Sequence, residues 1–315
     1  MAEATINTSV IVCTLDRLDL LRRCLDSLAA QTFTDPFEVV VVDNAVTEAG
    51  DPRVAAEVER ANAARPGTFV YRHSVGPNLS TARNTGLEAS RGTNIAFVDD
   101  DLVLPPDWLA TIVSVLRQTG ADGVLGLVRP RFLPGGEMDG LERHFTRDLP
   151  LPEGAPVGRN RHGFIDGVRT CNVIVRRSRT FGQGIWFDPA FGRSGGEDQD
   201  VFILFARRPA FRLAYSPAAE AEELIPPERQ NARYLKMRAF RNSQVFVRVL
   251  TKHRPNPRLA ALMQRIIGTI QWGRARTKRL LARPQGLARV EAEIAEATAA
   301  GKVFWRRPDL PGPYQ

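Results

Sequence analysis

Long apolar runs and clustered cysteines are both scarce in this 315-residue chain. No apolar run approaches the roughly 18 residues that a membrane-spanning helix needs. No N-terminal stretch combines the charged start, apolar middle and small-residue cleavage site of a secretory signal peptide. Cys13, Cys24 and Cys171 are scattered without metal-type spacing, which favours a reducing compartment. We therefore expect a cytoplasmic protein, or one bound to the membrane from its cytosolic side.

Positive charge is in excess, with a formal net charge of +8 and a sequence pI of about 10.0. The excess is concentrated in residues 251–283, which hold nine Lys or Arg and no Asp or Glu. Apolar residues recur there at three- and four-residue steps, which predicts an amphipathic helix. It would either lie on an anionic membrane surface or pack on the main domain with a solvated basic face. No helix-turn-helix, zinc site or aromatic-basic sheet pattern supports nucleic-acid binding.

Two parts of the chain differ in composition, with a change near Pro226-Pro227. The apolar fraction of 43% is that of an ordinary globular protein. We predict an α/β domain over residues 1–225 and a helical, basic C-terminal extension over residues 226–315. No residue pattern defines an oligomeric state.

Strand and helix patterns alternate along the first part of the chain. A parallel sheet with right-handed crossovers follows from this alternation. The predicted strands cover residues 9–13, 37–42, 68–72, 95–98, 122–128, 168–175 and 212–216. The first predicted helix covers residues 18–30, and the second and third end at about residues 64 and 90. Two more are predicted, one that starts after residue 105 and one over residues 201–205.

Polar residues cluster where several predicted strands end. Thr14, Asp16, Asp43 and Asp99 all occupy such positions. Because ligands of parallel α/β sheets bind beyond the carboxyl ends of the strands, these positions together predict a binding site.

Three consecutive carboxylates, Asp99 to Asp101, follow the apolar run of residues 95–98. Like charges this close stay ionised together only if a cation or hydrogen-bond donors offset their repulsion. A rigid strand end can hold oxygen ligands for a hard divalent ion. The alternative is a solvated acidic turn or a helix cap.

Two further polar groups lie at predicted helix starts. Arg83 falls in the first turn of a helix capped by Ser80 or Thr81, after a Gly-Pro-Asn turn. It is either a cation near a nucleotide or a solvated arginine. Glu197 and Asp198 follow a double glycine that lets the backbone bend tightly. They are either functional or an ordinary acidic helix start.

Taken in order, five stretches resemble those of family 2 glycosyltransferases, which have the GT-A fold. These stretches are Ser9–Arg17, Val40–Asn44, Ala82–Gly86, Phe97–Asp101 and Gly195–Asp200. The resemblance covers about residues 5 to 220 and implies an α/β fold with a mostly parallel central sheet flanked by helices. The stretch Arg238–Asn242 resembles exopolysaccharide glucosyltransferases of the succinoglycan type.

The resemblance implies a nucleotide pocket at the strand ends. Thr14 and Asp16, with the adjacent Arg17, would line it. Asp43 would accept a hydrogen bond from a uracil ring, and Arg83 would lie near the base or the diphosphate.

The resemblance also assigns the metal and the catalytic groups. Asp99 would contact ribose or the metal, Asp101 would bind the metal directly, and Asp100 would occupy the variable middle position beside the nucleotide. Asp198 would be the catalytic base, and Glu197 would support the acceptor side. The metal would be Mn²⁺ or Mg²⁺.

The implied activity is an inverting transfer of one sugar from a nucleotide sugar, with a UDP-sugar as the expected donor, to a saccharide or lipid-linked acceptor. The Gln-x-x-Arg-Trp motif of processive synthases is absent, which favours a single addition. One base without a second carboxylate nucleophile suits a single displacement. Arg238 and Arg241 are either stabilisers of the diphosphate or surface charges on a helix.

Two other functions are compatible with such a fold. A nucleotidyltransferase would need a glycine-rich phosphate loop after the first strand, and residues 13–17 contain no glycine. A non-catalytic sugar-nucleotide binder would not need the intact Asp99, Asp101 and Asp198.

Overall fold

One eight-stranded sheet forms the centre of the protein in the computed structural model, which describes residues 6–136, 140–146, 148–283 and 286–306. The strand order is β3-β2-β1-β4-β7-β6-β8-β5. The strands are β1 (Thr8–Thr14), β2 (Phe37–Asp43), β3 (Phe69–His73), β4 (Asn94–Asp99), β5 (Leu102–Val103), β6 (Gly123–Phe132), β7 (Asn172–Arg176) and β8 (Leu213–Ile225). Strands β1 to β4 are mutually parallel where they pair, and β7 is antiparallel to both β4 and β6.

The register of the parallel strands brings their carboxyl ends to one edge. Thr14 of β1 pairs with Asp43 of β2, and Cys13 pairs with Asp99 of β4. The predicted α/β architecture with a mostly parallel sheet is therefore confirmed, and its polar strand ends are aligned.

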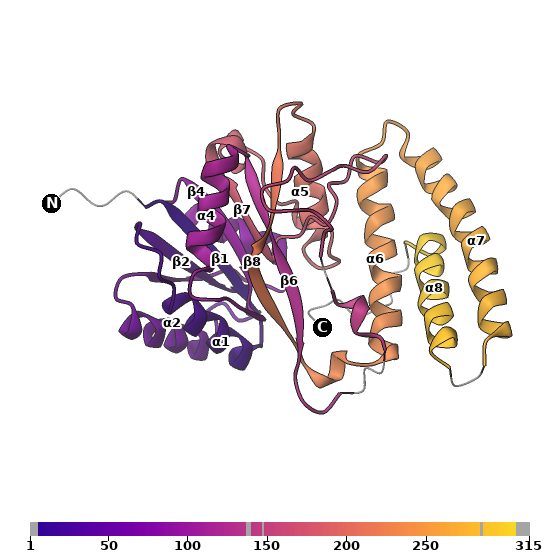
Figure 1. Cartoon of the computed structure of the whole chain (residues 1–315), viewed down its shortest axis with the longest axis horizontal. Helices are drawn as coiled ribbons and strands as arrows, with labels where there is room; N and C mark the ends of the chain where they lie inside the picture. Colours follow the sequence, from indigo (N-terminus) through magenta and orange to yellow (C-terminus); the bar gives the residue numbers. More distant parts are fainter. Residues whose placement is uncertain (1–5, 137–139, 147, 284–285, 307–315) are drawn as a thin grey trace.

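Helices cover both faces of the sheet (Figure 1). Side chains alternate between the two faces along each strand, so the apolar strands present a surface for packing on each face. Val10 and Val12 of β1 pack in one apolar layer with α1 (Leu18–Ala29), α2 (Pro52–Ala64) and α4 (Trp108–Thr119). Ile11 packs in the opposite layer with α3 (Leu79–Ala89) and α5 (Glu197–Ala206). These two layers hold the strand ends rigidly.

Two predicted strands have different bounds in the structure. The strand predicted over residues 168–175 begins only at Asn172. The short strand predicted over residues 212–216 continues to Ile225. A register shift between Gly126 and Val128 of β6 accommodates the irregular residues of β8, and pairing then resumes.

The predicted cap of α3 is also wrong. Asn78, rather than Ser80 or Thr81, is the N-cap residue, and its side chain accepts a hydrogen bond from Thr81 N at 3.1 Å. Asparagine is a preferred cap residue.

Three long helices follow the last strand: α6 (Ala232–Lys252), α7 (Pro257–Leu281) and α8 (Leu287–Val303). They lie at the right of Figure 1, where α8 packs between α6 and α7. None of the described helices is long and apolar enough to cross a membrane. The division at residues 225 and 226 stays a prediction, although β8 ends at Ile225.

Candidate active site

A polar cavity of about 240 Å³ lies between the strand ends, the N-terminus of α5 and the first half of α6. Asp99 of β4 and Asp198 of α5 both line it. Its further lining residues are Leu79, Arg83, Arg169, Thr170, Cys171, Ser194, Gly195, Gly196, Glu197, Gln199, Tyr234, Met237, Arg238, Arg241, Asn242 and Val245.

The double glycine aims the acidic pair into this cavity. Gly195 and Gly196 have φ angles of 82° and 101°, which disfavour any other residue. A Cβ atom on Gly196 would lie 2.6 Å from a side-chain carbon of Val245 in α6. The backbone of α5 can therefore begin directly against α6, with Glu197 and Asp198 in its first turn.

Arg83 connects the two acidic motifs. Its Nη1 donates to Glu197 Oε1 at 2.5 Å, and its Nη2 lies 3.5 Å from Asp99 Oδ1. Arg83 and Glu197 are only 4% and 5% exposed. Burial raises the pKa of Glu197, and the positive charge of Arg83 opposes that rise. The other oxygen, Glu197 Oε2, is buried and has no hydrogen-bond partner in the described part of the chain.

Asp198 is half-buried and lines the cavity beside Glu197. Its Oδ1 accepts a hydrogen bond from the backbone N–H of Gln199 at 2.6 Å. A carboxylate with further acceptor positions at the wall of a cavity can take a proton from a bound hydroxyl group.

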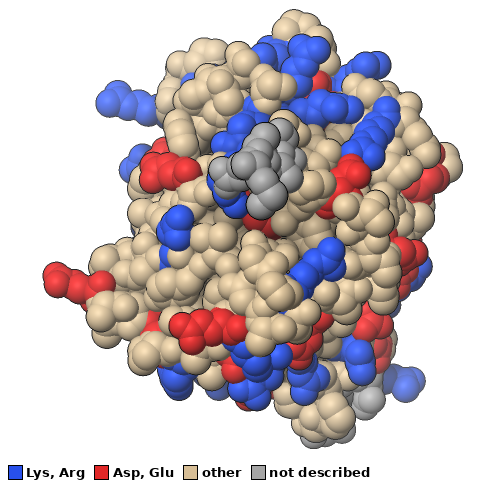
Figure 2. All heavy atoms as spheres, turned by 90° about the vertical axis from the view of Figure 1, so that its left-hand side faces the viewer, with Lys and Arg blue, Asp and Glu red and all other residues tan. Residues whose placement is uncertain are grey.

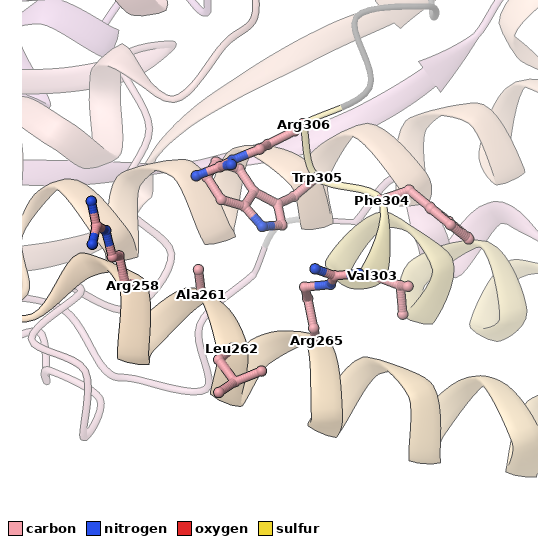
Figure 3. Close-up of a pocket in the computed structure, with 8 residues that line it drawn as sticks. All are labelled: Arg258, Ala261, Leu262, Arg265, Val303, Phe304, Trp305 and Arg306. Carbon is pink, nitrogen blue, oxygen red and sulfur yellow. The ribbon is translucent and has the colours of Figure 1, made fainter.

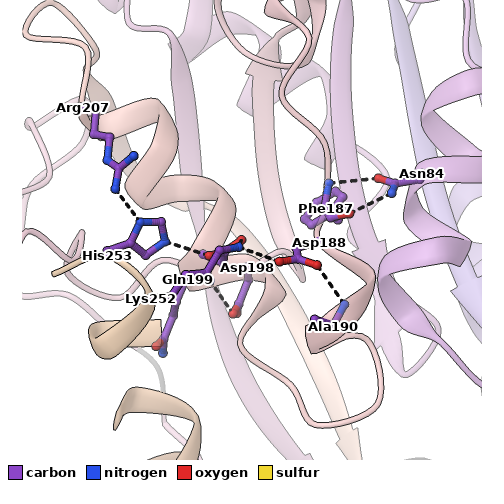
Figure 4. A network of polar contacts seen from close by, with 10 residues as sticks. Asn84, Phe187, Asp188, Ala190, Asp198, Gln199, Arg207, Lys252 and His253 are labelled. Atoms are coloured by element: carbon purple, nitrogen blue, oxygen red, sulfur yellow. Dashed lines mark hydrogen bonds and ion pairs between the residues drawn. The ribbon is translucent and has the colours of Figure 1, made fainter. Parts of the chain in front are cut away.

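Helix α5 is anchored by a buried ionic network on the side away from the cavity (Figure 4). Asp200 is fully buried, and Lys252 Nζ donates to its Oδ2 at 2.8 Å. His253 Nε2 lies 2.7 Å from Asp200 Oδ1, while Arg207 Nη2 donates to His253 Nδ1 at 2.8 Å. Lys252 also donates to Asp188 at 2.7 Å. These contacts hold α5 against the C-terminal end of α6.

A smaller hollow of about 40 Å³ adjoins the strand ends. Thr14, Arg17, Asp99 and Asp100 line it, together with Cys13, Leu15, Asn44 and Leu79. Asp100 accepts hydrogen bonds from Thr14 Oγ1 at 2.8 Å and Arg17 Nη1 at 3.0 Å. Burial raises the pKa of Asp100 to about 6, although the guanidinium of Arg17 opposes the rise.

Asp101 lies outside the lining of both hollows. Its side chain is buried, and its Oδ2 accepts from Arg17 at 3.2 Å and from Arg229 at 3.3 Å. The sequence analysis missed Arg229, because a contact 128 residues away leaves no local pattern. Asp101 can reach a metal ion only if these ion pairs rearrange.

Asp16 and Asp43 do not line either hollow. Asp16 is exposed, has a φ of 52°, and lines neither hollow. Asp43 is 1% exposed and accepts from Ala45 N, Asp51 N and Tyr71 Oη at 3.0, 2.5 and 3.0 Å. Asp43 thus fixes the loop after β2, and its contact with a base stays a prediction.

A divalent ion fits this acidic edge only with help from a ligand. Within the described residues, no three His, Cys, Asp or Glu side chains are grouped to hold a metal. Mg²⁺ is commonly bound by one or two carboxylates together with substrate phosphates. Asp99, whose side chain is 42% exposed and lines both hollows, suits such a site.

The wall of the cavity that α6 contributes is basic. Tyr234, Arg238 and Arg241 face it from α6 at helical spacing, and Arg169 joins them from the loop before β7. The sequence analysis considered Arg238 and Arg241 but missed Arg169 and Tyr234. The three- and four-residue steps along α6 were the signal that could have identified this wall.

The model of glycosyl transferase family 2 matches residues 9–178, which is more than half of the chain. The chain belongs to glycosyl transferase family 2. The succinoglycan biosynthesis protein ExoM of Rhizobium meliloti is 33% identical over 254 residues, covering 80% of this chain and 78% of that protein. A glucosyl-dolichyl phosphate glucuronosyltransferase of Haloferax volcanii is 30% identical over 39% of this chain and 38% of its own length.

Solved structures confirm the GT-A fold. The TarS fragment 1-349 of S. aureus, in complex with UDP, has a TM-score of 0.53 at 18% identity. The similarity covers 94% of this chain and 90% of that one. The mannosyltransferase PcManGT of Pyrobaculum calidifontis, in complex with GDP-Man and Mn²⁺, has a TM-score of 0.55 at 19% identity, covering 94% and 73%. The predicted family, fold and glycosyltransferase activity are confirmed.

Proposed function

We propose that this glycosyltransferase is inverting and metal-dependent, and that it transfers one sugar from a nucleotide sugar to a hydroxyl group, with Asp198 as the general base. The observation that carries this proposal is the shared cavity of Asp99 and Asp198. A donor held at Asp99 and an acceptor deprotonated by Asp198 would meet there, because both carboxylates line the same cavity of about 240 Å³.

On the donor side, the leaving diphosphate gains negative charge as its bond to the sugar breaks. A divalent ion, when bound, offsets this charge. Thr14, Arg17 and Asp100 would hold the nucleotide in the small hollow, and Asp99 would hold the metal with Asp101 after rearrangement. UDP is the proposed nucleotide, as in the TarS complex, and the metal is Mn²⁺, as in the PcManGT complex, or Mg²⁺.

On the acceptor side, Asp198 takes the proton of the attacking hydroxyl group. Glu197 is buried against Arg83, so it does not serve as a nucleophile. Its unpaired Oε2 supports the acceptor by accepting a hydrogen bond from a second hydroxyl group. Single displacement inverts the anomeric configuration, so an α-linked donor would give a β-linked product.

The basic wall acts on the same reaction. Arg238 and Arg241 line the same cavity as the carboxylates. We assign them to the departing diphosphate, because cations near a developing negative charge lower the barrier.

The acceptor is a saccharide or a lipid-linked saccharide, and the enzyme works in the cytoplasm, including the cytosolic face of the membrane. Support comes from the basic segment of residues 251–283. It also comes from two relatives, a succinoglycan biosynthesis protein and a glucosyl-dolichyl phosphate glucuronosyltransferase.

Nucleoside diphosphate release from a panel of UDP- and GDP-sugars tests the function. We expect release that depends on acceptor, and that falls at least about a hundredfold when EDTA removes divalent ions, since a metal contributes several kcal/mol at the transition state. Product NMR then reports the anomeric configuration. Pyrophosphate release from a nucleoside triphosphate and a sugar phosphate would instead indicate a nucleotidyltransferase. Donor binding without any release would indicate a non-catalytic binder.

A further inference from the structure

Helix α7 turns an apolar stripe to the solvent. Its members are five residues at three- and four-residue steps, each 52% or 53% exposed: Leu259, Leu262, Met263, Ile266 and Ile270. The opposite side of α7, with Gln264, Gly268 and Ala275, is buried against α8. Burial of the polar and small side rather than the apolar side is the reverse of ordinary packing, and it leaves the stripe available to a partner.

A hollow of about 450 Å³ borders this stripe. Arg258 and Arg265 lie two helical turns apart on α7, and Leu262 belongs to both the hollow and the stripe. The segment after α8 supplies the other wall with Trp305 and Arg306 (Figure 3). Figure 3 shows the indole of Trp305 directed over the hollow toward the α7 side chains.

The charge at this corner is of one sign. Within the described residues, Arg258, Arg265 and Arg306 have no ion pair with a carboxylate, whereas Arg279 of the same helix pairs with Glu296 at 2.8 Å. Elsewhere Lys and Arg are interspersed with Asp and Glu, as on the face shown in Figure 2. The unneutralised arginines therefore form a local positive site beside an apolar surface.

We propose that the hollow binds the phosphate of an anionic phospholipid, while the stripe of α7 enters the boundary of the acyl chains. Arginine forks suit phosphate oxygens, and an amphipathic helix with basic flanks and a half-buried tryptophan at its border suits a bilayer surface. Membrane binding of this kind would bring the cavity to a lipid-linked acceptor. Only this purpose rests on the proposed function.

A second copy of the chain fits this face less well. A two-fold dimer through the stripe would bring the same surface of each copy together. The arginines at its border would then face the arginines of the other copy, and like charges at short range repel. An anionic membrane satisfies the apolar stripe and the positive charge at once.

Co-sedimentation with vesicles tests the proposal on the full-length protein. Vesicles of phosphatidylcholine alone are compared with vesicles that also contain phosphatidylglycerol. The variant Arg258→Gln/Arg265→Gln is expected to bind the anionic vesicles about 25-fold more weakly than the wild type, from about fivefold for each arginine at an anionic surface. The variant Arg258→Lys/Arg265→Lys keeps the charge and should retain most of the binding.

The matched control is Arg23→Gln/Arg72→Gln, which removes the same charge from exposed positions on α1 and β3. Its binding should change by less than about twofold. Equal losses of binding in both double variants would overturn the site. So would a wild-type protein that does not prefer anionic vesicles. A wild-type dimer that dissociates in Arg258→Gln/Arg265→Gln would also overturn it. Nucleoside diphosphate release with a water-soluble acceptor, measured in parallel, should be unchanged in every variant. Loss of vesicle binding and loss of transferase activity are thus separate outcomes.

Discussion

The acidic wall of the cavity comes from a strand end and a helix N-terminus and is interlocked by short ion pairs, whereas the basic wall comes mainly from the surface of α6. Glu197 is 5% exposed and bonded to Arg83, which also reaches Asp99. Arg238 is only half-buried, and Arg169 is exposed. Both groups of residues line the same cavity.

This difference separates two kinds of functional residue. Removing a partner from the acidic wall leaves a buried charge uncompensated, so it should destabilise the fold as well as the reaction. Arg238 is half-buried and its guanidinium lies 5.1 Å from the centroid of the Phe145 ring, so removing cations from the basic wall should change the reaction much more than the stability.

The largest expected effect is that of Arg83→Met, which leaves the buried carboxylate of Glu197 without its cation. We expect the free energy of unfolding to fall by about 3–5 kcal/mol at neutral pH, as in other broken buried ion pairs. Urea unfolding followed by circular dichroism measures this change.

A second substitution isolates the cause of that loss. In Arg83→Met/Glu197→Gln the buried charge is absent, so we expect most of the stability to return. The loss in the single variant should also shrink as the pH falls, because the raised pKa of Glu197 lets it take up a proton. A loss that neither Glu197→Gln nor acid reduces would assign the effect to packing rather than charge.

Asp100 offers a pH-dependent test of the acidic wall. Burial raises the pKa of Asp100 from its ordinary value of 3.8 to about 6 in the folded protein. Between these values the folded state holds more protons, so this carboxyl lowers the free energy of unfolding as the pH rises, by up to about 3 kcal/mol. Relative to the wild type, Asp100→Asn should therefore gain stability from pH 3.8 to about 6 and stay level above that.

Denaturant midpoints measured across this pH range report the gain. Asp107→Asn, at an exposed carboxyl group without a side-chain capping bond, is the control and should show no such trend. A flat difference for Asp100→Asn would mean that the pKa of Asp100 is not raised in the folded protein.

The acidic wall could be predicted from the sequence because local patterns define it. The apolar residues 9–13, 37–42 and 95–98 predicted parallel strands, and parallel strands place their carboxyl ends together. This pattern placed Asp99 at a binding edge, whereas the roles of Glu197 and Asp198 followed only from the resemblance to family 2 glycosyltransferases. The double glycine predicted a tight backbone bend before α5, and the positive φ angles of Gly195 and Gly196 agree with it.

The basic wall and the support of Asp101 could not be predicted in the same way. Arg229 reaches Asp101 across 128 residues, and Arg169 lies in a long loop without a period. Such contacts depend on tertiary packing, which single-sequence patterns do not encode. The continuation of β8 beyond Ser216 likewise depends on its pairing with β6, which includes a register shift.

The smallest expected effect is on the basic wall. Arg238→Gln/Arg241→Gln should lower kcat/KM about tenfold through weaker stabilisation of the diphosphate. The free energy of unfolding should stay within about 0.5 kcal/mol. Arg233→Gln, an exposed position on α6 outside the cavity, is the matched control. A stability loss comparable with that of Arg83→Met would erase the contrast between the two walls.

The general base is tested most directly by Asp198→Asn, with donor binding and sugar transfer measured on the same preparation. Asparagine keeps the shape of the side chain but cannot take the acceptor proton. We predict an unchanged donor Kd and a fall in transfer of at least about a hundredfold, the usual scale for a general base. Near-normal turnover in Asp198→Asn would contradict the assignment of the base to α5.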